Sequence, residues 1–382
     1  MTPQALIAGV HEFPERKTAK SVLEIQAISA RAALEEAGLS KKDVDGYFTV
    51  ASNPGIGPLP IVDYLNLNPK IIDSTTIGGS SFVAHVAHAA AAIQAGLCEV
   101  ALVLYGSTAA SNAVAIGTGM GGERRDPAAS FTTPYGMTTV GSYALVAQLH
   151  RQRFGTTAEQ LAEIAVTMRH HASLNPHAKM RQPITVDDVL ASRVISDPLH
   201  LLDCCIISDG GGAVVVTSAA RARDLPKAPV LLLGCGEAVA HQETGAPDLL
   251  TTAGRQSGER AFGMAGVTRD DIDLCMIYDS FTITVLATLE NLGFCAVGDG
   301  GAFVSDGRIR LGGALPVNPD GGGLSSNHPG MRGIFLVIEA TRQLRGDRGA
   351  AQVKDARTAL CHGTGGMLGQ RHSGATIVLE RL

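Results

Sequence analysis

Short apolar segments alternate with longer segments of helical periodicity along this chain, and the alternation predicts an α/β fold. Three apolar runs have the length and β-branched composition of buried strands, namely residues 100–104, 213–216 and 377–379. Three segments have the apolar spacing of helices, namely residues 22–37, 82–94 and 335–344. The 45 glycines among the 382 residues are a larger share than the average of about 7%. They predict many tight turns and close approaches of the backbone.

An internal repeat predicts that the fold consists of two related halves. Residues 37–45 recur as residues 265–273, a shift of 265 − 37 = 228 positions. In both copies a glycine ends a helix, and Ser40 or Thr268 then caps a short helical turn. Two further pairs of segments follow in the same order, namely 5–9 with 230–234 and 211–216 with 373–378. We therefore expect halves at residues 1–225 and 226–382.

Residues from about 107 to 200 interrupt the first half and differ from it in composition. They contain the segment Arg124-Arg125-Asp126-Pro127 and two predicted helices, at residues 140–154 and 157–172. We expect an inserted cap over the sheet edge. Its loops should shape the substrate pocket, because binding residues are concentrated on loops held by a rigid scaffold.

The composition excludes several classes of function. Hydrophobic residues make up 45% and charged residues 18%, values typical of a globular protein. The net charge is −5 and no basic run is present, so a nucleic-acid partner is not expected. The N-terminus leads into a short apolar run only, and we expect neither a signal peptide nor a membrane span. Seven cysteines without CxxC spacing favour the cytoplasm and argue against a metal site.

The segment Ser325-Ser326-Asn327-His328-Pro329-Gly330 places an imidazole at the entry of a predicted helix, residues 331–344. Proline suits the first helical turn, and the backbone donors there stabilise negative charge. His328 is therefore a candidate catalytic residue, and the alternative is that it serves only the helix entry.

About thirty residues later, Cys361 follows a short predicted strand, residues 358–360. Gly363, Gly365 and Gly366 come next, and we expect the strand to end at Cys361 and the glycines to form a turn close to a ligand. In the alternative reading, Cys361 is an inert buried thiol and His362 has a structural role.

Taken together and in this order, these motifs resemble the thiolase superfamily, in particular the sterol-carrier-type thiolases and their thiolase-like relatives. The resemblance covers nearly the whole chain. The other segments that carry it are Thr133-Pro134-Tyr135-Gly136, residues 192–199, Leu202-Asp203-Cys204-Cys205, residues 208–213, Tyr278-Asp279-Ser280-Phe281 and residues 318–322. It implies a thiolase fold with two βαβαβαββ halves in an α/β/α/β/α core, each half holding a five-stranded sheet, and a homodimer.

The resemblance also implies chemistry at a carbon–carbon bond beside a coenzyme A thioester, with no covalently bound cofactor. His328 matches the histidine that donates to the thioester or enolate oxygen, and Cys361 matches the cysteine that moves the α-proton. Gly79, Ser80, Asp279 and Gly363 fall in segments that bind the acyl group or its oxyanion. The run Arg169-His170-His171 either contacts the anionic end of coenzyme A or forms a solvated helix face.

The family's nucleophilic cysteine is missing. Thiolases carry it before a helix, and counting back from Gly96 puts Gly79 in its place, with a register uncertainty of about one residue. No cysteine occurs at residues 75–82. Ser80 could attack only with an activating base, and otherwise it is the cap of the helix.

Tyr278 is the second departure, because thiolases have Asn or His at this position. Thiolase-like aldolases of steroid side-chain degradation also lack the cysteine and use tyrosines. Tyr278 is thus either the acid/base for a β-hydroxyacyl-CoA or a ring packed at a strand end. The sequence favours retro-aldol cleavage over a true thiolase with an atypical nucleophile or a non-catalytic acyl-CoA or lipid-binding protein. Relatives of this kind often work with a small OB-fold or zinc-ribbon partner.

Overall fold

The computed structural model describes residues 5–51, 57–113, 138–222, 225–240, 248–369 and 371–382. The first half holds β1 (Ala5–Glu12), α1 (Val22–Glu36), β2 (Gly46–Phe48), α2 (Leu59–Leu65), β3 (Ile71–Asp73), α3 (Ser81–Gln94), β4 (Val100–Ser107), β7 (Gly210–Ser218) and α8 (Ala219–Ala222). The second half holds β8 (Val230–Ala240), α9 (Ala253–Ala265), β9 (Leu274–Ile277), α10 (Thr282–Leu292), α11 (Gly300–Ser305), α12 (Gly333–Arg345), β10 (Thr358–Gly366) and β11 (His372–Arg381). The predicted α/β alternation is confirmed.

The two halves repeat one topology. The first half orders its strands β1-β7-β4-β2-β3, and the second orders its strands β8-β11-β10-β9. In the two half-sheets, β1 and β8 occupy equivalent places, and so do β7 and β11. The sequence repeat predicts both pairs. The half-sheets meet through β1 and β8, where Leu6 pairs with Leu231 and Ile7 with Val230. The structure therefore supports the inferred duplication.

The repeated turns have the local structure that their sequence predicts. Gly38 and Gly266 end their helices with positive φ angles of 66° and 70°, as a glycine C-cap does. Ser40 and Thr268 are each bonded through backbone N–H and hydroxyl to the aspartate three residues later. Each turn leads directly into the strand that follows it.

The second sheet is shorter than the resemblance implies. A fifth strand equivalent to β3 is reduced to a single parallel bridge between Cys275 of β9 and Val317. The backbone turns away directly afterwards, because Asn318 adopts a φ of 49° and its amide bonds both the N–H and the carbonyl of Ile277. The prediction of five strands in each half is correct for the first half only.

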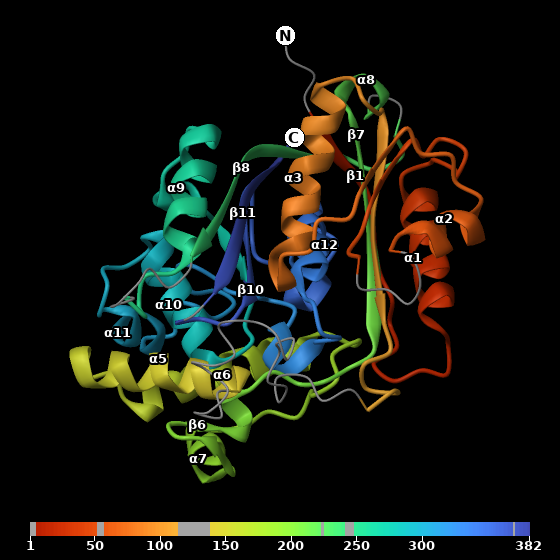
Figure 1. Cartoon of the computed structure of the whole chain (residues 1–382). Helices are drawn as coiled ribbons and strands as arrows, with labels where there is room; N and C mark the ends of the chain where they lie inside the picture. The colour runs from red at the N-terminus through yellow and green to blue at the C-terminus, as the bar shows by residue number, and fades with distance from the viewer. Residues whose placement is uncertain (1–4, 52–56, 114–137, 223–224, 241–247, 370) are drawn as a thin grey trace, which may run out of the picture.

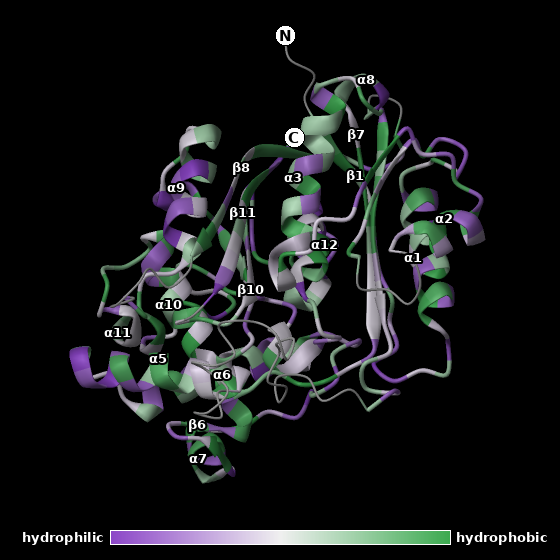
Figure 2. Ribbon diagram, in the orientation of Figure 1, coloured by the Kyte–Doolittle hydropathy of each residue, from purple (hydrophilic) through white to green (hydrophobic). Residues whose placement is uncertain are grey.

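Helices α3 and α12 lie between the two half-sheets, with α1 and α2 on one outer side and α9 and α10 on the other (Figure 1). Every residue of α12 from Gly333 to Thr341 is buried, and α3 is buried along most of its length. Small side chains on α3 let both helices fit between the sheets. Hydrophobic residues follow β1 and β8, whereas hydrophilic residues gather on outer helices such as α9 (Figure 2). These layers agree with the α/β/α/β/α core that the resemblance implies.

The described part of the insertion, from residue 138 on, forms a cap beneath the ends of the strands (Figure 1). It contains α5 (Thr139–Phe154), α6 (Ala158–Leu174), α7 (Val186–Ala191), and the short strands β5 (Val194–Ser196) and β6 (Leu199–His200). The segments 124–127 and 133–136, singled out from the sequence, lie outside the described residues. Among the helices of the described ranges, none combines the length and apolar character needed to cross a membrane.

Candidate active site

A cavity of about 340 Å³ lies where the two central helices begin. Gly78 and Gly79 line it before α3, and His328 and Gly330 line it before α12. The end of β9 contributes Tyr278. The end of β10 contributes Thr364, Gly365 and Gly366, and the cap contributes Thr139, Val140, Tyr143 and Ile195. Residues of the insertion therefore line this cavity, as expected if it is the substrate pocket.

Gly79 and Tyr278 share one small space in the cavity wall. A Cβ atom on Gly79 would lie 2.3 Å from Cε2 of Tyr278 and 2.5 Å from the carbonyl oxygen of Thr364, well inside van der Waals contact. The tyrosine ring thus occupies the volume that a side chain at position 79 would need. A cysteine cannot occupy this position while Tyr278 keeps its place.

Tyr278 and His328 form a hydrogen-bonded pair. The phenol oxygen lies 2.9 Å from Nε2 of His328, and the rings meet edge to face at 87°. The tyrosine follows β9 directly, and its backbone N–H donates to the carbonyl of His362 on β10. The structure brings together two of the three residues predicted as catalytic, from separate elements of the second half.

The backbone around His328 is fixed on both sides. Its N–H donates to Oγ of Ser208, and its carbonyl accepts from the N–H of Ser208. The hydroxyl of Tyr105 donates to the carbonyl of Pro329 at 2.7 Å. The helix expected at residue 331 begins at Gly333, after a turn in which Gly330 has a φ of 100°. Pro329 therefore belongs to this turn rather than to the first turn of the helix.

Both members of the pair are neutral at physiological pH. Burial, together with the nearby Arg332 cation, lowers the pKa of His328 to about 4. Burial also raises the pKa of Tyr278 well above its ordinary value. Nδ1 of His328 is buried without a hydrogen-bond partner among the described residues. A neutral imidazole beside a neutral phenol can accept the phenol proton as the phenol accepts one from a substrate.

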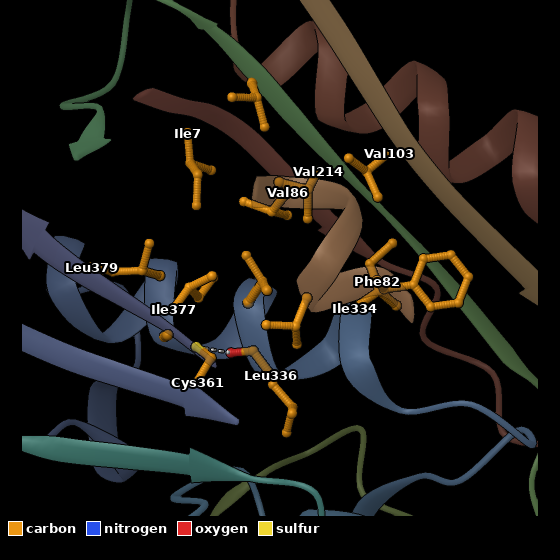
Figure 3. Packing of buried hydrophobic residues seen from close by; sticks show 14 of the residues in the cluster. Ile7, Phe82, Val86, Val103, Val214, Ile334, Leu336, Cys361, Ile377 and Leu379 are labelled. Carbon is orange, nitrogen blue, oxygen red and sulfur yellow. Dashed lines mark hydrogen bonds between the residues drawn. The ribbon is translucent and has the colours of Figure 1, made fainter. Parts of the chain in front are cut away.

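Cys361 does not reach the cavity. The strand β10 continues through it to Gly366, so the predicted strand end is wrong. The thiol is fully buried between the sheet and α12 and lies 3.5 Å from the carbonyl of Leu336, among side chains such as Ile377 (Figure 3). Burial raises the pKa of this thiol. Its position gives no support to a role in moving the α-proton.

The glycines after Cys361 belong to the strand because another element packs on them. A Cβ on Gly363 would lie 2.8 Å from Cα of Ser80, and one on Gly365 would lie 2.0 Å from the carbonyl oxygen of Ile77. Glycine at these positions lets the start of α3 touch the sheet. His362 points to the opposite face, where its Nδ1 lies 2.8 Å from the hydroxyl of Thr376, in agreement with a structural role.

Three residues predicted to bind the acyl group or its oxyanion stand behind the cavity wall. The hydroxyl of buried Ser80 donates to the carbonyl of Ile77 and lies 2.6 Å from that of Ser373, and it makes no helix-capping bond. The Asp279 carboxylate accepts from the N–H groups of Gly323 and Leu324. Gly363 faces Ser80, as described above. Of the four residues in this group, Gly79 alone lines the cavity.

The cavity has an apolar wall that sequence reasoning did not assign. It includes Tyr143, Leu201, Ile207, Phe281 and Met331. These residues come from the cap, from the segment after it and from the second half, and the spacing of apolar residues in the sequence does not show the direction of a side chain.

Two thiols, Cys204 and Cys205, also line the cavity. Both are half-buried. Burial raises the pKa of Cys204 to about 12 and raises that of Cys205 as well. Neither is a thiolate at neutral pH, and a thiol is a weak nucleophile in that state.

Two alternatives were stated for residues 169–171, a contact with coenzyme A and a solvated helix face. Neither holds for Arg169 or His171. Arg169 is buried and donates to the hydroxyl of Ser325 at 2.9 Å. His171 is also buried, lies 3.1 Å from the carbonyl of Asn318 through Nδ1, and accepts from the N–H of Leu311. Both side chains thus hold the loop that leads to His328. Only His170 lies on the exposed face.

Comparisons with known proteins agree with this architecture. The model of the family described as "Thiolase C-terminal domain-like" matches residues 236–381. A steroid side-chain-cleaving aldolase of Thermomonospora curvata is 36% identical over 90% of both chains. The 17-hydroxy-3-oxo-4-pregnene-20-carboxyl-CoA lyase of Mycobacterium tuberculosis is 34% identical over 91% of this chain and 92% of its own.

A solved structure extends the match to three dimensions. An Ltp2–ChsH2(DUF35) aldolase superposes with a TM-score of 0.89 at 30% identity, over 100% of this chain and 99% of that one. The identity and coverage of these relatives exceed what a shared fold alone would give. The chain therefore belongs to the thiolase superfamily, in the branch of sterol-carrier-type thiolases and lipid-transfer-type aldolases.

Proposed function

We propose that this protein is a lyase that cleaves β-hydroxyacyl-CoA thioesters by a retro-aldol reaction. The observation that carries the proposal is the tyrosine ring packed against Gly79, because it replaces the nucleophile of a thiolase with a phenol paired to an imidazole. Two relatives that cover most of the chain are an aldolase and a CoA lyase by name, which supports the same reaction class.

The reaction needs no redox partner and no net proton. The β-hydroxyl loses its proton, the bond between Cα and Cβ breaks, and its electron pair forms the enolate of the shortened thioester. The former hydroxyl carbon leaves as the carbonyl of an aldehyde or ketone. The enolate then takes one proton at Cα, so atoms and charge balance.

The Tyr278–His328 pair supplies both proton transfers. Tyr278 accepts the hydroxyl proton while its own proton passes to Nε2 of His328, 2.9 Å away. The imidazolium formed in this step stabilises the enolate charge. The pair then returns a proton to Cα, the step assigned to Cys361 on sequence grounds. Such positioned acid–base groups contribute factors of about 10² to 10⁴.

The cavity favours an apolar acyl group. Its wall includes Val140, Tyr143, Ile195 and Phe281, and its size falls in the range of about 300 to 1,000 Å³ that small-molecule sites occupy. Together with the names of the two relatives, this supports a ring-bearing substrate such as a steroid side-chain thioester. Coenzyme A enters as part of the substrate, and we propose no covalently bound cofactor.

We also propose a cytoplasmic homodimer with a small OB-fold or zinc-ribbon partner. The strand β3 stands at the edge of the sheet and exposes 41% of Ile72, a surface on which a second copy can add strands. The matched solved structure is that of an aldolase named for two components, one of them a DUF35 protein, which supports the partner.

Product analysis tests the proposal. The protein, alone and with any co-purified partner, is incubated with 3-hydroxyacyl-CoAs that carry short, aromatic or steroid side chains. We expect a carbonyl product and a shortened acyl-CoA in equal amounts, both measured by mass spectrometry. Absence of a carbonyl product from every substrate under both conditions would refute a lyase.

A further inference from the structure

A single buried guanidinium contacts one residue on either side of the site, by hydrogen bonds to Asn327 and by an ion pair with the carboxylate of Asp279. Arg332 is fully buried. Its Nη1 donates to the backbone carbonyl of Asn327 at 3.1 Å and to the Asn327 side-chain oxygen at 2.5 Å. Its Nη2 donates to the carboxylate of Asp320, and its Nε lies 3.4 Å from Oδ1 of Asp279. All four residues are at least 97% buried.

Two of these partners adjoin the proposed catalytic pair. Asn327 directly precedes His328, and Asp279 directly follows Tyr278. We propose that Arg332 is a positioning residue that sets the separation of Tyr278 and His328 by holding both adjoining residues at once. The inference rests on the proposed function, because it assigns to Arg332 the geometry on which that proton transfer depends.

Asn327 and Asp279, which Arg332 contacts, are themselves bonded to other parts of the fold. The Asn327 side chain donates to Oε1 of Glu12 at the end of β1, and Arg342 of α12 forms an ion pair with the same carboxylate. On the other side, Asp279 accepts from two N–H groups of the π-helical turn Gly322–Ser326. Because these partners belong to the first sheet and to the loop before His328, the guanidinium cannot shift without disturbing several buried bonds.

The chemistry of arginine suits this task better than that of lysine. A guanidinium presents five N–H donors in a rigid plane, and here that plane meets Asn327, Asp320 and Asp279 together. An ammonium group keeps the charge but has no such planar fork. The Arg332 cation also disfavours a second positive charge on His328, in addition to the effect of burial.

The test compares Arg332→Lys, directly before α12, with Arg345→Lys, a matched change at the last residue of that helix. Arg345 has a side chain that is 3% exposed and bonds the backbone of Ala8 and Ala228, but it has no contact with either neighbour of the pair. We expect Arg332→Lys to lower kcat by about 10- to 100-fold, with KM changed less than about threefold, as misplacement by about 1 Å does. Arg345→Lys should lower the melting temperature similarly and leave kcat within about twofold.

A second variant and a second readout complete the experiment. Asn327→Ser removes one acceptor of the guanidinium and leaves both carboxylates paired, so it should lower kcat in the same direction even if Arg332→Lys folds poorly. Imidazole signals in ¹H–¹⁵N spectra, assigned with His328→Gln, report the bond between His328 and Tyr278 without turnover. Arg332→Lys and Asn327→Ser should shift the His328 signal, and Arg345→Lys should not.

The outcomes separate this inference from the proposed function. If the wild type cleaves its substrate but the Arg332 and Asn327 variants keep kcat within twofold and an unchanged His328 signal, Arg332 does not position the pair. If the wild type cleaves no β-hydroxyacyl-CoA, the proposed lyase fails, and a shifted His328 signal in both variants still supports the positioning.

Discussion

The ring of Tyr278 fills the space in which a side chain on Gly79 would stand. A hypothetical Cβ on Gly79 would lie 2.3 Å from the ring, so a larger residue at position 79 requires Tyr278 to move or to be replaced. This structure accommodates the tyrosine after β9 but not, at the same time, a cysteine side chain at position 79 before α3. In this protein the missing side chain at position 79 and the tyrosine at position 278 are therefore two parts of one packing arrangement.

Restoring the thiol at position 79 should damage the protein rather than convert it into a thiolase. Gly79→Cys forces its side chain against Tyr278 and Thr364, and overpacking of this kind costs about 1 to 3 kcal/mol. We expect a lower unfolding midpoint in urea, weaker lyase activity and no acyl adduct. Gly263→Ala on α9 is the control, since a Cβ there meets nothing within 4 Å. A stable Gly79→Cys protein that becomes acylated would contradict this packing argument.

Removal of the phenol oxygen should abolish most of the activity and lower the stability only slightly. Tyr278→Phe keeps the ring against Gly79 but loses the bond to His328, so we expect kcat to fall by about 10² to 10⁴. The free energy of unfolding should change by about 1 kcal/mol. Steady-state kinetics and urea unfolding measure the two effects. Tyr64→Phe, at a residue 56% exposed on α2, should change neither, and a Tyr278→Phe enzyme with wild-type kcat would exclude the assigned role.

The pH profile of kcat/KM should have its acid limb near pH 4. The neutral imidazole accepts the proton, and burial together with Arg332 lowers the pKa of His328 to about 4, so activity is lost only as the pH falls through that value. No alkaline limb from Tyr278 is expected below pH 10, because its pKa is raised. An exposed histidine would instead give a limb near 6.5, and that result would place His328 outside the pair.

Stability should decline over a higher pH range than activity. Burial lowers the pKa of His85, His171 and His372 to about 4 and that of His362 to about 3. These imidazoles take up protons on unfolding once the pH is below about 6.5, so their stabilisation is full above that value and falls toward pH 4. Each contributes a slope of about 1.4 kcal/mol per pH unit. Urea unfolding at pH 5, 6 and 7.5 measures this loss of stability. A free energy of unfolding that stays level from pH 7.5 to 5 would be inconsistent with neutral buried imidazoles.

Cys361 should prove dispensable for turnover. Cys361→Ala removes a buried sulfur from a packed cluster, so we expect a loss of about 1 to 2 kcal/mol in the free energy of unfolding and a rate within about threefold of wild type. Iodoacetamide should label the half-buried Cys295 before Cys361, as peptide mapping will show. Rapid labelling of Cys361 that acyl-CoA prevents would return the thiol to the site.

The sequence was sufficient for the parts of the fold that local patterns determine. The repeat of Gly38 and Ser40 in Gly266 and Thr268 has a local physical cause in helix capping, and it revealed the duplication. His328 and Tyr278 stood out because one precedes a helix within a glycine-rich segment and the other departs from the pattern of a known family. Both lie in the cavity.

Tertiary packing determined what the sequence alone did not show. The glycines at 363 and 365 were interpreted as a turn, but they serve a strand on which the start of α3 rests. Because of that interpretation Cys361 was expected in the site, whereas it lies in the core. Likewise, Arg169 looked like a surface residue because the partner that buries it, Ser325, is 156 positions away. Local periodicity carries no information about such contacts.

The most direct test is product and intact-mass analysis of the wild type and Tyr278→Phe during turnover of a β-hydroxyacyl-CoA. We predict that the wild type releases a carbonyl compound and a shortened thioester with no mass added to the protein, and that the variant releases neither at a comparable rate. A protein mass increased by an acyl group, or equal cleavage by both proteins, would contradict a reaction driven by the tyrosine and histidine.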